Sequence, residues 1–141
     1  MKRLVLIPVV ALLLAWQASQ VAAQCAEGES LYFSWQTVVI AMDVANINHD
    51  IALANLNTAL DALWQKQQEA IQHLQGHANC GVQYTCYTAL QLQAAISDLS
   101  NLVDEKYADE QSTQYTLNSA IATEQQAWWD MVAHIEWCPE C

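Results

Sequence analysis

Residues 76–81 read Gly-His-Ala-Asn-Cys-Gly, and this short segment decides how the chain folds. It separates two long tracts, 29–75 and 82–138, that contain neither glycine nor proline. Both tracts are rich in alanine, leucine and glutamine, which favour helix, whereas clustered glycine and asparagine favour a turn. The sequence therefore predicts an all-α fold in which two long helices form an antiparallel hairpin about this turn.

An alternative divides each tract once. The breaks would lie near Asn48 and near Glu110, with Asp50 capping one new helix and Ser112 or Thr113 capping the other. Four shorter helices would then pack as an up-down-up-down bundle. We favour the hairpin because turns between helices usually contain glycine, and neither candidate break has one.

Apolar residues in the first tract recur at alternating spacings of three and four, as in a coiled coil. The predicted seam runs from Trp35 to Leu74 and includes polar residues at Asn46, His49 and Gln67. The apolar face is wider than a two-stranded seam needs. A second apolar stripe lies beside the seam and consists of Val44, Ile47 and Ile51.

The second tract keeps the same rhythm from Leu92 to Val103 and again from Leu117 to Cys138. Between these stretches it slips by one residue at Tyr107. Such a slip is typical of a stutter, which locally unwinds a supercoil.

Folding the chain at residues 76–81 brings its two tails together. The expected neighbours are Trp35 with Trp128, Cys25 with Cys138, and His49 with Gln114 or Glu110.

The first 23 residues have the features of a secretory signal. Lys2 and Arg3 precede an apolar run over residues 4–16, and small residues lead to a cleavage site after Ala23. The run is short for a stable transmembrane helix. We therefore expect a signal peptide at 1–23, a single helical domain at 24–141, a secreted or periplasmic location, and no stable membrane span after cleavage.

The charge of the chain excludes one class of partner. The formal net charge is -11, and removal of the leader leaves two basic residues, Lys66 and Lys106, against 15 acidic ones. Such a polyanion repels phosphate backbones, so we expect no nucleic-acid binding.

All five cysteines lie after the predicted cleavage site, which in an exported chain favours disulfides. We expect Cys80 to pair with Cys86, and Cys25 to pair with either Cys138 or Cys141. One thiol is then left over. A redox role for the Cys138–Cys141 pair is disfavoured, because it follows a helix C-terminus, where the dipole opposes a thiolate.

One cluster has the spacing of a metal site. His73, His77 and Cys80 would share one face if the helix continued, and imidazoles with a thiolate suit zinc or copper. A disulfide between Cys80 and Cys86 would remove this ligand set. We therefore expect no cofactor and keep metal binding as the alternative function.

The tryptophans indicate how the protein works. The sequence has no phosphate-binding loop, nucleophile elbow or metalloprotease motif, so we expect a non-enzymatic protein. Adjacent Trp128 and Trp129 point about 100° apart on a helix, so one of them should be exposed. The sequence predicts contacts with a protein partner or a second copy through Trp35, Trp128, Trp129 and Trp137.

Overall fold

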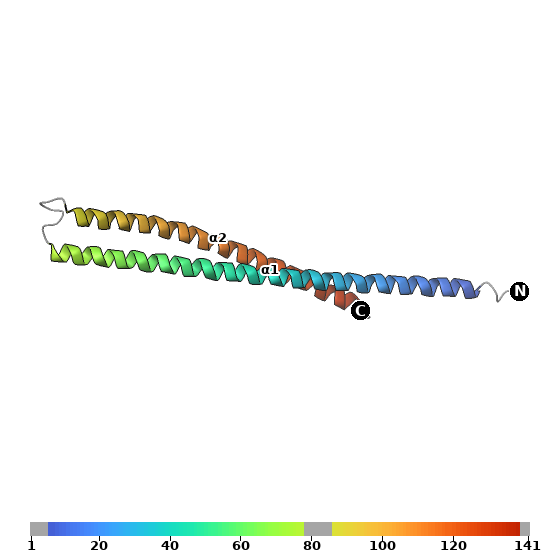
Figure 1. Ribbon diagram of the computed structural model, residues 1–141. Helices are drawn as coiled ribbons and strands as arrows, with labels where there is room; N and C mark the ends of the chain where they lie inside the picture. Colours follow the sequence, from blue (N-terminus) through green and yellow to red (C-terminus); the bar gives the residue numbers. More distant parts are fainter. Residues whose placement is uncertain (1–5, 78–85, 139–141) are drawn as a thin grey trace. The chain divides into compact units, whose positions relative to one another are not determined.

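The computed structural model describes residues 6–77 and 86–138, with side chains from residue 25 onward. These residues form two helices, α1 (Leu6–Gly76) and α2 (Tyr87–Trp137), drawn in Figure 1. The absence of glycine and proline from the long tracts explains their continuity, since nothing in them removes a backbone hydrogen bond or favours a turn.

The predicted hairpin of two long helices is confirmed. Neither helix is interrupted near Asn48 or Glu110, so the four-helix alternative is wrong. The candidate capping residues Asp50, Ser112 and Thr113 all lie inside continuous helix, and Thr113 donates its hydroxyl to the carbonyl oxygen of Glu110 at 2.9 Å.

The chain divides into two compact units, and each contains a segment of both helices. The terminal unit comprises residues 1–43 and 119–141, and the middle unit comprises residues 44–118. Within each unit, side chains of α1 contact side chains of α2.

In the middle unit, the α1 seam is built on small residues. The buried positions recur at heptad-like spacings of seven, four and three, and they are Ala45, Ala52, Leu56 and Ala59. Alanine has no side chain beyond Cβ, so it lets the backbone of a neighbouring helix approach closely.

From Asn46 onward, the predicted α1 seam was wrong at every second position, whereas Trp35, Val39 and Met42 are half-buried as predicted. Leu53 and Leu60 are 41% and 43% exposed, and Asn46 is also exposed, whereas the alanine preceding each of them is buried. The predicted second stripe of Val44, Ile47 and Ile51 is present and exposed.

In α2 of the middle unit, the predicted stutter near Tyr107 is absent. The spacing between buried and half-buried side chains alternates between four and three residues without a break. Polar residues occupy the seam positions at which the sequence has no apolar residue. The series is Leu92, Ile96, Leu99, Val103, Lys106, Glu110, Thr113 and Leu117.

In the terminal unit, one close approach depends on glycine. A Cβ atom built at Gly28 would lie 3.0 Å from Nε2 of His134, tighter than an ordinary van der Waals contact. Met131, one turn before His134, is buried. Gly28 therefore lets α1 and α2 come together near the two tails.

Candidate interaction surfaces

The terminal unit holds an aromatic cluster centred on Trp35. Its indole Nε1 donates a hydrogen bond of 2.8 Å to Oε1 of Glu124. Its ring centroid lies 5.3 Å from that of Trp128, with the planes 57° apart, and 5.9 Å from that of Tyr32. The predicted pairing of Trp35 with Trp128 is confirmed, and Trp35 is fixed by both its ring and its N–H.

The other tryptophans of the predicted interface face outward. Trp128 is 40% exposed, Trp129 64% and Trp137 86%, and Phe33 on α1 is 63% exposed. We call Phe33, Trp129 and Trp137 the aromatic patch. The expectation that Trp128 and Trp129 cannot both be buried is confirmed.

A cavity of about 440 Å³ lies between the helices of the terminal unit. This volume is in the range of small-molecule binding pockets in proteins. Its lining is mostly apolar and aromatic and includes Cys25, Gly28, Glu29, Tyr32, Phe33, Met131, His134, Ile135 and Cys138.

The placement of the cysteines agrees in part with the sequence analysis. Cys25 and Cys138 line the same cavity, as expected for neighbouring tails. Cys138 carries a free thiol, whereas Cys25 and Cys86 each have an interaction partner. Cys80 and Cys141 lie outside the described residues, so the expected pairings stay predictions.

The candidate metal cluster is partly assembled. The rings of His73 and His77 lie 4.8 Å apart, and Nε2 of His73 is 3.1 Å from Sγ of Cys86. The third predicted ligand, Cys80, lies outside the described residues. Within 25–77 and 86–138, no three histidine, cysteine or acidic side chains are grouped closely enough to hold a metal ion.

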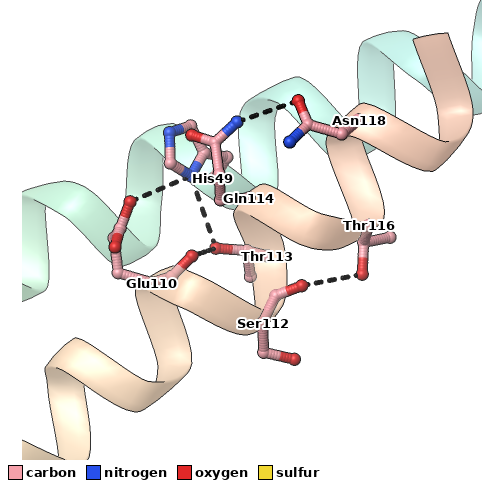
Figure 2. A network of polar contacts seen from close by, with 7 residues as sticks. All are labelled: His49, Glu110, Ser112, Thr113, Gln114, Thr116 and Asn118. Atoms are coloured by element: carbon pink, nitrogen blue, oxygen red, sulfur yellow. Dashed lines mark hydrogen bonds and ion pairs between the residues drawn. The ribbon is translucent and has the colours of Figure 1, made fainter.

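The middle unit has a polar network across the helix seam (Figure 2). Nδ1 of half-buried His49 lies 3.9 Å from Oε1 of Glu110 and 3.5 Å from Oγ1 of Thr113. Because the Thr113 hydroxyl donates to a backbone carbonyl, its oxygen is left to accept, which favours a proton on Nδ1 of His49.

The prediction for His49 is right about the seam and about Glu110, one of its two expected neighbours. The other expected neighbour, Gln114, instead donates from Nε2 to Oδ1 of Asn118 at 3.2 Å (Figure 2). Thr113 was not predicted, although its spacing of four from Leu117 places it in the same seam.

A second hollow, of about 360 Å³, lies along one side of this network. Its lining includes Asn48, Ile51 and Asn55 of α1 with Lys106 of α2. Nζ of Lys106 donates to Glu105 at 2.7 Å and to Asp109 at 3.4 Å, and these carboxylates raise the pKa of the lysine. Lys106 is therefore a cation held in place beside the exposed stripe, and the sequence analysis did not single it out.

Comparison with known proteins identifies no relative. No protein-family model, characterised protein or solved structure matches this chain. In the described part of the chain, neither helix contains a stretch that is both apolar and long enough to cross a membrane. The proposals below therefore depend on the chemistry of the surfaces alone.

Proposed function

We propose that this chain is an exported, non-enzymatic helical protein that acts by binding another protein through the aromatic patch of its terminal unit. The observation that carries the proposal is the exposure of Phe33, Trp129 and Trp137 in a unit that also holds an apolar cavity, which Phe33 lines. Exposed aromatic side chains near a recess are typical of the centre of a protein interface, where they supply most of the binding energy.

The geometry of the terminal unit supports a preorganised surface. Trp35 is held by its hydrogen bond to Glu124 and by its contact with Trp128, so its position is fixed before a partner binds. A surface that is ordered before binding loses less conformational entropy on association. The acidic charge of the chain favours a partner with basic residues around an apolar centre.

We also propose that two disulfides staple the hairpin. Cys138 has a free thiol, and Cys25 and Cys86 have partners. Among the pairings that the sequence predicts, those that leave Cys138 free are Cys25 with Cys141 and Cys80 with Cys86. A non-reducing peptide map tests this assignment. A bridged peptide containing Cys138 would contradict it.

Site-specific photo-crosslinking tests the binding function. A photoreactive phenylalanine analogue is placed at Trp137 in the producing cell, with a matched probe at Leu90, which is 52% exposed and lies in the middle unit. We expect one discrete covalent adduct from the Trp137 probe, lost in the Trp129→Ser background. Equal adducts from both probes, or none from Trp137, would contradict the proposal.

The proposed export is tested by determining where the mature protein begins. We expect the purified extracytoplasmic protein to begin at Gln24, which intact-mass analysis detects. A product that retains residues 1–23 would overturn the proposed cleavage.

Metal binding is the alternative function, and the contact between His73 and Cys86 is the observation that favours it. Titration of the reduced protein with zinc alone tests it. Tight binding that is lost in His73→Ala and absent from the oxidised protein would support this alternative over the protein-contact function.

A further inference from the structure

The middle unit exposes a second, outward seam on α1. Val44, Ile47 and Ile51 are 52%, 56% and 55% exposed, although isoleucine and valine are among the residues most often buried. Ala54 and Thr58 continue the same alternation of three and four and are also exposed. We call these five residues the α1 stripe.

The α1 stripe is distinct from the seam that contacts α2. The inward seam uses Ala45, Ala52, Leu56 and Ala59, which fall on other positions of the heptad. At 3.6 residues per turn, the centres of the two sets lie about 130° apart around the helix. A helix with two separate heptad seams can contact one helix of its own chain and one helix of another.

The spacing and the flanks of the stripe indicate which kind of surface covers it. Alternating spacings of three and four, with β-branched residues at both core positions, match a neighbouring helix in a coiled coil. Asp50 lies on one flank, and Asn48 and Asn55 lie on the other. A lipid surface would leave these polar side chains without partners, whereas another helix can offer them hydrogen bonds.

The two flanks are complementary to each other. One flank carries the Asp50 carboxylate, and the opposite flank carries the amides of Asn48 and Asn55, which line the hollow together with Lys106 and its carboxylate partner Asp109. In a parallel, in-register pair of helices, each flank of one copy meets the other flank of the second copy. Asp50 of each copy then lies beside Asn55 of the other, whose amide can donate a hydrogen bond to the carboxylate.

An antiparallel pair lacks this complementarity. Ile47 of one copy would lie against Ile51 of the other, and the equivalent flanks would meet. Asp50 would then face Asp50, and like charges at such positions destabilise association.

We propose that the α1 stripe is the surface through which this chain associates with a second copy of itself, with the two α1 helices parallel and in register. The stripe belongs to the middle unit, so the proposal does not rest on the aromatic patch. It adds self-association to the proposed binding of a different protein.

Sedimentation equilibrium of the purified protein tests the proposal. The variant is Ile51→Glu, and the matched control is Leu90→Glu, which changes an α2 residue of the same unit with 52% exposure against 55% for Ile51. We expect the unmodified protein and Leu90→Glu to sediment with at least twice the chain mass. We expect Ile51→Glu to associate at least tenfold more weakly, with unchanged helicity by circular dichroism.

The outcomes separate this proposal from the others. An unmodified protein that stays monomeric, or equal weakening by Leu90→Glu and Ile51→Glu, would overturn it. Trp137→Ser is expected to keep the association, so loss of crosslinking at the aromatic patch leaves the self-association result intact. Association lost in Trp137→Ser and kept in Ile51→Glu would assign the contact to the aromatic patch instead.

A cysteine crosslink tests the orientation. Ala54→Cys is introduced with Cys138→Ser, and oxidised glutathione serves as the oxidant: two thiols form one disulfide as the oxidant is reduced to two molecules of glutathione. A parallel, in-register pair brings the two new thiols together, so we expect a covalent dimer on a non-reducing gel. Ala108→Cys, an exposed α2 position, is the control. No dimer from Ala54→Cys, or equal dimer from both variants, would contradict the parallel arrangement.

Discussion

The terminal and middle units use the same two helices but hold them together in different ways. In the terminal unit, large rings meet across the seam, and Trp35 both stacks against Trp128 and bonds to Glu124. In the middle unit, alanines occupy the α1 seam and a histidine meets a glutamate and a threonine. A cavity lies between the helices of the terminal unit, whereas the alanines of the middle unit favour a close approach. The seam is therefore built from large side chains in one unit and from small ones in the other.

The largest expected effect distinguishes buried from exposed leucine in the middle unit. Leu56→Ala should lower the free energy of unfolding by about 3 kcal/mol, because it removes a side chain that is 8% exposed. Leu53→Ala, at 41% exposed, should cost less than about 1 kcal/mol. Urea denaturation measures both. Equal losses of stability in the two variants would mean that Leu53 is buried in the seam like Leu56, as the sequence predicted.

A second change tests the close approach at the alanines. Ala59, which is 4% exposed, should not accept a larger side chain, so Ala59→Leu should cost about 2 kcal/mol through overpacking. Ala54→Leu changes an exposed position of the same helix and should leave unfolding nearly unchanged. Thermal unfolding of both proteins, followed by circular dichroism under conditions where they are monomeric, gives the comparison. A stabilised Ala59→Leu variant would mean that the seam contains unfilled space at Ala59.

A third change addresses the terminal unit. Trp35→Phe keeps an aromatic ring and removes the N–H that donates to Glu124, so it should cost about 1.5 kcal/mol. Trp64→Phe is the control, since Trp64 is 61% exposed. A double-mutant cycle with Glu124→Ala isolates the pair, and a coupling energy of zero would show that the hydrogen bond contributes nothing.

The smallest expected effect is an increase, rather than a decrease, in the free energy of unfolding. A lone polar residue in a seam lowers stability while fixing register. His49→Leu should therefore raise the free energy of unfolding by about 1 kcal/mol. Asn46→Leu, at an exposed position that was predicted to lie in the seam, should change it by less than about 0.5 kcal/mol. Chemical denaturation checks both variants, and a stabilising Asn46→Leu would place Asn46 back in the seam.

The sequence was sufficient for the hairpin and insufficient for its register. Long tracts without glycine or proline leave a single concentrated turn signal, and this predicts two helices and neighbouring tails. The α1 seam was misassigned at alternate positions because the pattern favoured leucine over the smaller alanine at Leu53 and Leu60. In the middle unit the buried positions are instead alanines, one residue earlier, which favours close packing of the two backbones.

The supposed slip in α2 has a similar origin. Lys106, Glu110 and Thr113 were excluded from the seam because they are polar, yet all three are half-buried. A lysine can cover apolar surface with its methylene chain while its ammonium group reaches water. The polar network at His49 was therefore predicted with Glu110 or Gln114 and without Thr113.

The contacts between the two helices differ in their separation along the sequence, and this difference sets an order for folding. The contact between His73 and Cys86 spans 13 residues, that between His49 and Thr113 spans 64, and that between Trp35 and Glu124 spans 89. The entropy lost on closing a loop grows with its length. Pairing that starts where α1 and α2 are connected and proceeds toward the tails therefore avoids closing a long loop in one step. The contact between Trp35 and Glu124 then forms last and opens first, and the proposed disulfide between the tails would restrain the longest loop of all.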